Sequence, residues 1–130
     1  MINDPISDLF TRFRNAVTSK LDNFKVPYSN SKKSILSICK SYGFIDSFEI
    51  VKDTNYSTII VKLKYFNGKP VVSFLKTISK PGKRVYVQKS QIPKVLNGYG
   101  LSLLNTSKGL IDGKSARLHN VGGELIGIIH

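Results

Sequence analysis

Residues 101–111, LSLLNTSKGLI, place a cluster of small and polar side chains between two apolar segments. Residues 101–104 are expected to form a strand, which enters the cluster NTSKG at residues 105–109. An amide, two hydroxyls, a lysine and a glycine favour a turn because they bond nearby backbone or permit unusual dihedral angles. The same groups can grip an anion, so this stretch predicts either a self-bonded turn or a turn that binds a polyanion.

The composition favours a polyanion as the partner. The 130 residues include 20 Lys and Arg against 8 Asp and Glu, a formal net charge of +12. Charge of this sign attracts nucleic acid first and an acidic membrane surface second. The excess is concentrated in residues 66–130, which hold 10 basic and 2 acidic residues. This half is therefore the better candidate for an anion-binding surface.

The sequence predicts an intracellular protein without a membrane segment. Cys39 is the single cysteine, which excludes an intrachain disulfide. No apolar run approaches the roughly 20 residues that span a bilayer. Residues 1–10, MINDPISDLF, lack the basic and apolar regions of a secretory signal.

The first half of the chain predicts an α/β lobe at residues 1–67. Asp4 and Pro5 are typical of a helix start. The apolar residues that follow at helical spacing are Ile6, Leu9, Phe10, Phe13 and Val17. A second helix is expected over residues 31–42, ending at Gly43, and its apolar stripe is Ile35, Ile38, Cys39 and Tyr42. Strands are expected at residues 24–28, 45–52 and 58–66, and Asn67-Gly68 marks a turn.

The second half predicts a mostly β lobe at residues 68–130. Strands are expected at residues 71–79, 84–88, 101–104 and 124–129. Lys80-Pro81-Gly82 marks a turn, and residues 93–97 can form one helical turn closed by Gly98. Because 41% of the residues are hydrophobic, the chain can build a core. The predicted fold class is therefore α+β with two small lobes, the first with two helices and about three strands.

Residues 109–115, GLIDGKS, come close to a phosphate-binding P-loop without matching it. The P-loop needs four residues between its glycines, and here there are three. The helix that should follow has room for only one or two turns before Gly122 and Gly123. A nucleotide-binding enzyme is therefore the weakest of the alternatives.

The sequence also lacks the residue patterns of a metal site and of a nucleophilic enzyme. His119, His130 and Cys39 are the only soft metal ligands, and their spacing matches no zinc pattern. No local pattern couples Ser107 or Cys39 to a base and an orienting acid. We expect no enzyme activity, no metal and no cofactor.

The polar groups of the second half suit RNA. Asn105, Thr106 and Ser107 can donate to phosphates, 2′-hydroxyls and base edges, and Lys108 adds charge attraction. Tyr86 offers a ring for stacking on a base; the alternative is a half-buried strand aromatic. Glycines at positions 98, 100, 109, 113, 122 and 123 permit close backbone approach to a ligand.

Two polar groups of the first lobe have two interpretations each. Thr11, Arg12 and Asn15 point away from the apolar stripe and form either a solvated face or an RNA contact. Lys32 and Lys33 lie in the first turn of the second helix, where the helix dipole disfavours cations. Something should compensate their charge, and a phosphate is one possibility.

Short motifs that occur in order along nearly the whole chain resemble a known family. They are Asp4-Pro5-Ile6, Leu9-Phe10-Thr11-Arg12-Phe13-Arg14-Asn15, Gly43-Phe44-Ile45, Leu63-Lys64-Tyr65, Ser79-Lys80-Pro81-Gly82-Lys83-Arg84-Val85-Tyr86, Thr106-Ser107-Lys108-Gly109, Ala116-Arg117 and Gly122-Gly123-Glu124. In content and spacing they resemble the bacterial-type small-subunit ribosomal protein eight family.

The resemblance implies a structural constituent of the small ribosomal subunit. Members of this family are primary binders of the central domain of small-subunit rRNA, and they promote its folding and subunit assembly. The resemblance also implies an α/β N-terminal lobe and a C-terminal lobe built on a small antiparallel sheet. The expected partners are this rRNA and small-subunit protein five. Some bacterial members also bind and repress their own mRNA, and no self-association is expected. The expected location is the ribosome of a bacterial cytoplasm or of an organelle matrix. A non-ribosomal RNA chaperone remains the alternative.

The family's RNA-binding residues transfer to named positions here. In the C-terminal lobe they are Lys83, Arg84, Tyr86, Asn105, Thr106, Ser107, Lys108, Gly109, Arg117, Gly122, Gly123 and Glu124. In the N-terminal lobe they are Thr11, Arg12, Arg14, Asn15, Lys32 and Lys33.

Asn105 and residues 112–115 depart from the family's pattern, and Glu124 places an acid in a site for RNA. Asn105 stands where the family usually has serine, and its longer side chain can shift one contact. Residues 112–115, DGKS, are shorter and looser than the family's usual charged residues, which affects a peripheral contact. Glu124 either props the turn at residues 105–107 or accepts a hydrogen bond from a base amino group.

The near-match to a P-loop can be tested directly. Because the loop length is wrong and the following helix is short, we expect no binding of labelled ATP in equilibrium dialysis with magnesium. Saturable binding at micromolar ATP would contradict the non-enzymatic interpretation.

Overall fold

The computed structural model describes residues 5–80, 82–95 and 99–130 and divides into two compact units, Met1–Ser73 and Phe74–His130. Unit 1 contains two helices and a three-stranded sheet, and unit 2 contains a five-stranded sheet with short helices. The predicted α+β class with two lobes is confirmed. The expectations for Asp4, for Pro81 and for a turn closed by Gly98 lie outside the described residues.

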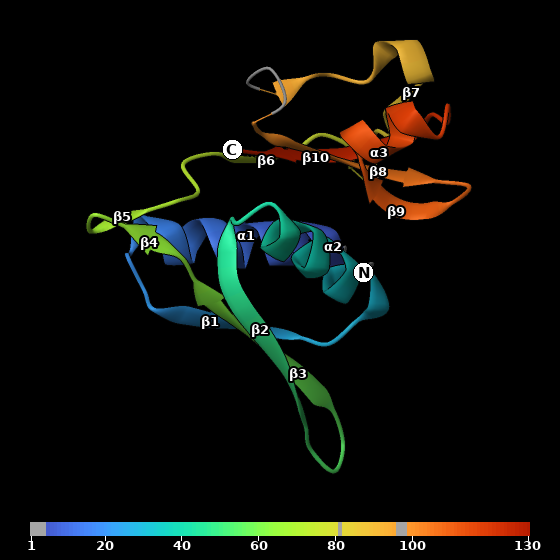
Figure 1. Cartoon of the computed structure of the whole chain (residues 1–130). Coiled ribbons are helices and arrows are strands. Elements are labelled where there is room, and N and C mark those ends of the chain that lie inside the picture. The colour runs from blue at the N-terminus through green and yellow to red at the C-terminus, as the bar shows by residue number, and fades with distance from the viewer. Residues whose placement is uncertain (1–4, 81, 96–98) are drawn as a thin grey trace. The chain divides into compact units, whose positions relative to one another are not determined.

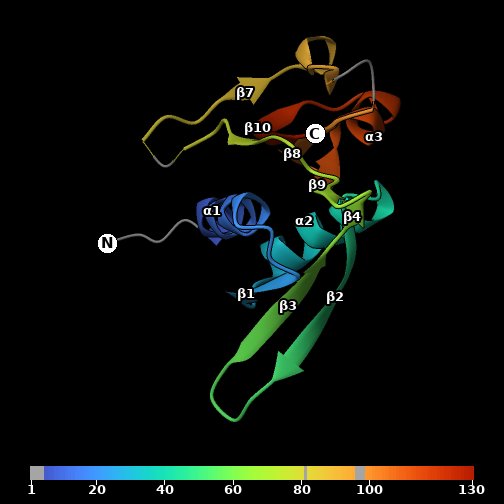
Figure 2. The same ribbon diagram turned by 90° about the vertical axis from the view of Figure 1, so that its left-hand side faces the viewer.

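Unit 1 is an antiparallel sheet with two helices on one of its faces (Figure 1). The helices are α1 (Pro5–Thr18) and α2 (Asn30–Ser41). The strands are β1 (Asn23–Pro27), β2 (Ile45–Lys52) and β3 (Ser57–Leu63), in the order β1-β3-β2. Figure 2 shows that β2 and β3 form one long hairpin.

The helices of unit 1 bury the predicted apolar stripes with small shifts. In α1 the buried residues are Leu9, Phe10, Phe13 and Ala16, whereas Ile6 and Val17 are half-buried. In α2 they are Lys32, Ile35, Leu36 and Cys39, whereas Ile38 and Tyr42 are half-buried. The burial of a lysine in α2 was not expected, because a charged group needs partners inside the protein.

A short hairpin follows the sheet of unit 1. It consists of β4 (Tyr65–Phe66) and β5 (Lys69–Pro70), joined by the predicted turn at Asn67 and Gly68. Both turn residues have positive φ, 52° and 79°, as the tightest hairpin turns require. The sequence-based boundary between residues 67 and 68 falls in this turn, whereas the compact units divide between Ser73 and Phe74. The whole hairpin therefore belongs to unit 1.

Unit 2 is organised around its last strand, β10 (Gly123–Ile129). Its strand order is β6-β10-β8-β9, and β7 also pairs with β10. The other strands are β6 (Leu75–Thr77), β7 (Tyr86–Val87), β8 (Leu101–Thr106) and β9 (Gly109–Asp112). All of these pairs are antiparallel. The expected strands at residues 71–79 and 84–88 are thus longer than the observed ones, and β9 was not predicted.

One face of this sheet carries the core of unit 2. Leu104 and Leu125 are opposite each other on β8 and β10 and pack with Ile92 and Ala116. Ala116 comes from α3 (Gly113–Leu118), and Ile92 follows the short 3-10 helix η1 (Lys89–Gln91). Burial of these side chains holds α3 against β8 and β9.

The environment of Cys39 gives a stability-linked prediction. The side chain is fully buried in α2, and burial raises the pKa of its thiol to about 12. At pH 8 the thiol therefore stays protonated in the folded protein, whereas the exposed thiol of the unfolded chain, with a pKa near 8.5, is partly ionised. We expect a thiol-reactive dye to label the folded chain at least ~10³-fold more slowly than the chain in 6 M guanidinium. Comparable labelling rates would show that α2 is not packed as described.

Candidate RNA-binding surface

Three strands of unit 2 bring Tyr86, Asn105 and Glu124 into one row. Glu124 on β10 is opposite Tyr86 on β7 and opposite Asn105 on β8. Directly opposed residues of antiparallel strands point to the same face of a sheet. Tyr86 and Glu124 are 38 positions apart in the sequence and Asn105 is 19 positions from each. These three side chains meet because β10 lies between β7 and β8.

Tyr86 is available to a ligand. Its side chain is 70% exposed, so the alternative of a half-buried strand aromatic is wrong. Asn105 is exposed in the same row, while Glu124 retains only 14% of its side-chain exposure. The row therefore offers a ring and an amide to the solvent on either side of a sheltered carboxylate.

The cluster at residues 105–109 is a self-bonded turn. The Thr106 hydroxyl donates to the Gly109 carbonyl oxygen at 3.0 Å and accepts from the Lys108 N–H at 3.1 Å. Gly109 has a φ of 99°, which places it in a conformation that favours glycine. The turn joins β8 to β9 and leaves Ser107 and Lys108 exposed at its tip. Thr106 therefore shapes the turn, and Ser107 and Lys108 face outward.

Glu124 ties a loop to the sheet. Its Oε2 accepts from the Ser79 hydroxyl at 2.6 Å and from Nη1 of Arg84 at 3.1 Å. Ser79 Oγ in turn accepts from the backbone N–H of Val85 at 3.1 Å. The carboxylate was expected to act on the turn at residues 105–107 or on a base, but its bonds go to these residues of the loop before β7. Its negative charge is thereby matched by a guanidinium inside the protein.

The remaining predicted residues of unit 2 have different environments. Lys83 is exposed and pairs through its backbone with Lys80. Arg117 is half-buried on α3, and its Nη1 donates to the Ile92 carbonyl oxygen at 3.3 Å. A Cβ on Gly123 would lie 2.3 Å from the Asn105 carbonyl oxygen, and one on Gly122 would lie 2.4 Å from that of Val87. These two glycines thus permit close approach of neighbouring protein backbone.

In unit 1 the predicted cations differ in how they are used. Lys32 has only 5% of its side chain exposed, and its Nζ donates to the Pro27 carbonyl oxygen at 3.0 Å and lies 3.5 Å from Asp8 Oδ2. Nε of Arg12 donates to both Asp8 oxygens at 3.0 and 3.1 Å, and its Nη1 donates to the Lys25 carbonyl oxygen at 3.1 Å. Asp8 therefore supplies the compensation for Lys32 that the sequence left open. The exposed members of the set are Thr11, Arg12, Arg14, Asn15 and Lys33.

The stretch that resembled a P-loop has another role. Residues 109–112 form β9, and Asp112 caps α3 by accepting from the Ser115 N–H at 3.4 Å. Gly113 is buried so tightly that an added Cβ would lie 2.0 Å from Ser102 Oγ. A strand followed by a capped helix of six residues leaves no loop to surround a phosphate.

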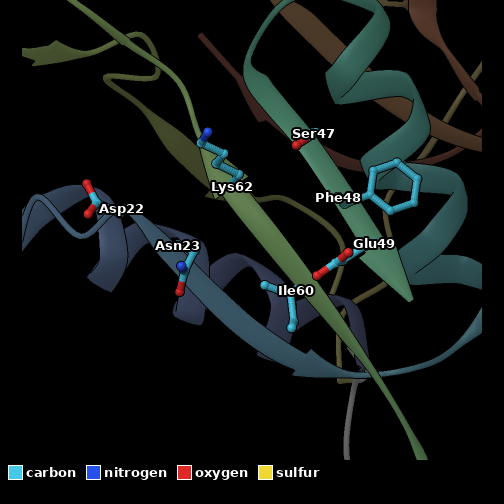
Figure 3. A pocket seen from close by; sticks show the side chains of 7 residues that line it. All are labelled: Asp22, Asn23, Ser47, Phe48, Glu49, Ile60 and Lys62. Carbon is cyan, nitrogen blue, oxygen red and sulfur yellow. The ribbon is translucent and has the colours of Figure 1, made fainter. Parts of the chain in front are cut away.

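The open face of the unit 1 sheet carries mixed charge. A hollow of about 410 Å³ lies there, and Figure 3 shows the side chains that line it. Asp22 and Glu49 contribute carboxylates, and the ammonium of Lys62 lies 3.6 Å from Asp46 Oδ2. This hollow is a poor candidate for binding a polyanion.

No group of three or more His, Cys, Asp and Glu side chains is placed to hold a metal ion among the residues that the structure describes. Within the same ranges, no helix has the length and apolar character needed to cross a bilayer.

Comparison with known proteins decides the family. Residues 4–130 match the sequence profile of the family described as Ribosomal protein S8. The chain belongs to the ribosomal protein S8 family. The small ribosomal subunit protein uS8 of Staphylococcus saprophyticus is 49% identical over 129 residues, covering 98% of both chains. The protein of the same name from Streptococcus pneumoniae serotype 19F is 48% identical over 130 residues, covering 99% of this chain and 98% of that one. The resemblance found in the motifs is thus confirmed.

The S8-family residues of unit 2 fall into two groups, those that bond within the protein and those that are exposed to solvent. Glu124, Ser79, Gly122, Gly123 and Thr106 build the sheet and the turn through contacts within the protein. Tyr86, Asn105, Ser107 and Lys108 are the exposed groups that this frame presents. We call these four residues the exposed row and tip.

The bonds of Glu124 predict its contribution to stability. Glu124→Ala leaves Ser79 and Arg84 without their acceptor, so we expect the free energy of unfolding to fall by about 1–3 kcal/mol. Glu124→Gln keeps one acceptor oxygen and should cost less. The measurement is urea unfolding followed by circular dichroism.

A matched control and a cycle make this test specific. Glu49→Ala removes an exposed glutamate of β2 and should change stability by no more than ~0.5 kcal/mol. Ser79→Ala combined with Glu124→Ala should cost less than the two single changes added together, because they remove the same bond. Strict additivity would show that the Ser79–Glu124 bond does not contribute.

Proposed function

We propose that this chain is a structural, non-catalytic constituent of the small ribosomal subunit, and that unit 2 binds the central domain of small-subunit rRNA. The observation that carries the proposal is the exposed row and tip, in which a ring, an amide, a hydroxyl and an ammonium group are held by a rigid frame. Family membership supports the ribosomal role, since its relatives are named small ribosomal subunit proteins.

The chemistry of the four groups matches what irregular RNA offers. Tyr86 can stack on an unpaired base, and such stacking is worth about 1–3 kcal/mol per base. Asn105 both donates and accepts, which suits base edges and 2′-hydroxyls. Ser107 and Lys108 project from the turn and can bond phosphate oxygens.

Rigidity adds to the affinity. The Thr106 hydroxyl holds the turn from within, and β10 holds Tyr86 and Asn105 in one row. Side chains on a preformed frame lose less conformational freedom on binding than side chains on a mobile loop. RNA of the right shape is therefore favoured over RNA that must be refolded.

Charge supplies attraction without shape selection. Unit 2 carries nine basic and two acidic residues, and one of those acids, Glu124, is neutralised by Arg84. Positive charge on Lys83 and Lys108 lowers the cost of approaching a phosphate backbone and makes binding sensitive to salt. By displaying Thr11, Asn15 and Lys33, unit 1 adds further contacts to the same rRNA.

Finer aspects of the proposal follow the family. The bound chain helps the central domain to fold during subunit assembly, lies beside small-subunit protein five and works in the ribosome. Binding of its own mRNA through the same exposed row and tip would give a regulatory loop. All of these depend on the same selection of RNA shape.

Affinity for a transcript of the rRNA central domain tests the proposal. Tyr86→Ala and Ser107→Ala should each weaken binding by about 1–3 kcal/mol, because each removes one base or backbone contact. Lys108→Gln should lower the slope of log affinity against log salt by about 1. The measurement is filter binding of labelled transcript between roughly 50 and 300 mM KCl, a range wide enough to give the slope.

Matched variants distinguish contact from general charge loss. Ser90→Ala and Lys52→Gln remove an exposed hydroxyl and an exposed ammonium outside the exposed row and tip, and they should leave affinity nearly unchanged. Excess unrelated RNA should not displace the transcript. Equal losses in all variants, together with displacement by any RNA, would favour a nonspecific RNA chaperone instead.

A further inference from the structure

The β4–β5 hairpin of unit 1 carries an exposed phenyl ring. Phe66 is 72% exposed, although a phenylalanine gains stability when it is buried. Its neighbours in the hairpin include Lys64 and Lys69. None of these three residues belongs to the surfaces described above.

The pairing of the hairpin places its basic and aromatic groups on one face. Phe66 is directly opposite Lys69. The N–H of Val71 donates to the Lys64 carbonyl oxygen at 3.0 Å, which continues the same pairing by one further step. Alternation along each strand then puts Lys64, Phe66, Lys69 and Val71 on one side.

The opposite side anchors the hairpin. Tyr65 is paired with Pro70, and its hydroxyl donates to the carbonyl oxygen of Leu21 in the connection between α1 and β1. At the other end, the turn at Asn67 and Gly68 uses the left-handed conformations that suit the twist of a hairpin. The face with Phe66 is therefore held in a fixed orientation before any ligand arrives.

A hollow of about 500 Å³ lies on this face. Its lining comprises Gly43, Lys64, Phe66, Lys69, Pro70 and Val71, which includes two ammonium groups and no carboxylate. Gly43 brings its backbone close to the ammonium of Lys64, since an added Cβ there would lie 3.6 Å from Nζ of Lys64. The volume falls within the roughly 300–1,000 Å³ of typical ligand sites.

The other exposed aromatic of unit 1 shows what distinguishes this hollow. Tyr56 is 66% exposed, and its carbonyl oxygen accepts from the N–H of Asp53 in the turn between β2 and β3. The hollow beside Tyr56 is lined by one lysine, Lys25, and by Arg12, whose guanidinium is already bonded to Asp8. Of the hollows described here for unit 1, the one at Phe66 combines a ring with two lysines that make no ion pair among the described residues.

We propose that the β4–β5 hairpin binds one unpaired nucleotide of RNA, with the base stacked on Phe66 and its phosphate between Lys64 and Lys69. Aromatic rings accept any base face, and flanking cations follow the backbone, so this combination suits single-stranded RNA. An apolar protein segment would leave two ammonium groups unpaired at its edge, which disfavours that occupant. The proposal rests on the proposed rRNA-binding function and adds a second contact to it.

Fluorescence gives a direct test, because the chain contains no tryptophan. Phe66→Trp introduces one reporter into the hollow, and Tyr56→Trp introduces a matched reporter at the other exposed aromatic of unit 1. With the central-domain transcript as the probe, we expect quenching of the Phe66→Trp emission that saturates with binding. The Tyr56→Trp emission should stay unchanged.

Affinities measured on the same transcript complete the test. Phe66→Ala should weaken binding roughly tenfold, whereas Phe66→Tyr retains a ring and should weaken it less than about twofold. Lys64→Gln combined with Lys69→Gln should lower the salt slope, and Lys40→Gln combined with Lys52→Gln, a pair of exposed lysines elsewhere in unit 1, should not.

The outcomes separate this proposal from the proposed function. If Tyr86→Ala weakens binding while Phe66→Ala and the Phe66→Trp emission show no effect, the hairpin contact is wrong and the rRNA-binding function stands. If the emission changes only in assembled subunits and not with the transcript, the hairpin does not contact the central-domain RNA and the proposal is again wrong. If the unmodified chain does not bind the transcript, both proposals fail.

Discussion

The pairing of β10 with three other strands is the constraint on which unit 2 depends. This strand bonds β6 and β7 along one edge and β8 along the other. Leu125 on one face closes the core, and Glu124 on the other face gathers the loop at residues 79–85. Tyr86 and Asn105 lie in one row because this strand runs between them. The candidate site is therefore a property of the sheet, and the turn at residues 105–109 is one edge of it.

Charges in this protein fall into two groups with different tasks. Arg12, Lys32, Arg84 and Arg117 donate to carboxylates or to backbone carbonyl oxygens, so they stabilise local structure. Lysines such as Lys83 and Lys108 are exposed and supply the positive field. A buried charge without a partner would cost several kcal/mol. This cost applies to Lys32, which has 5% of its side chain exposed and therefore needs its partners Asp8 and the Pro27 carbonyl oxygen. The exposed lysines can attract RNA.

The same division explains how two small units can present rigid surfaces. In each case one hydroxyl fixes the hairpin by a hydrogen bond to a backbone carbonyl oxygen. Thr106 bonds within the β8–β9 turn, and Tyr65 reaches the carbonyl oxygen of Leu21 from the β4–β5 hairpin. Each hairpin then displays an exposed group at or near its tip, Ser107 in one and Phe66 in the other. Binding groups are held in place by residues that do not themselves need to touch a ligand.

The sequence alone determined the two helices of unit 1, most of the strands, the turns at residues 67–68 and 105–109, the excess of positive charge and the family. These features are local, since helical spacing, alternation and turn residues report on the nearest neighbours along the chain. The tertiary structure decided which charged side chains bond within the protein and which are exposed to solvent. Glu124 bonds residues that are 45 and 40 positions away, and Lys32 finds its carboxylate on another helix. No local pattern carries such information, because a hydrogen bond between distant segments depends on the packing that brings them together.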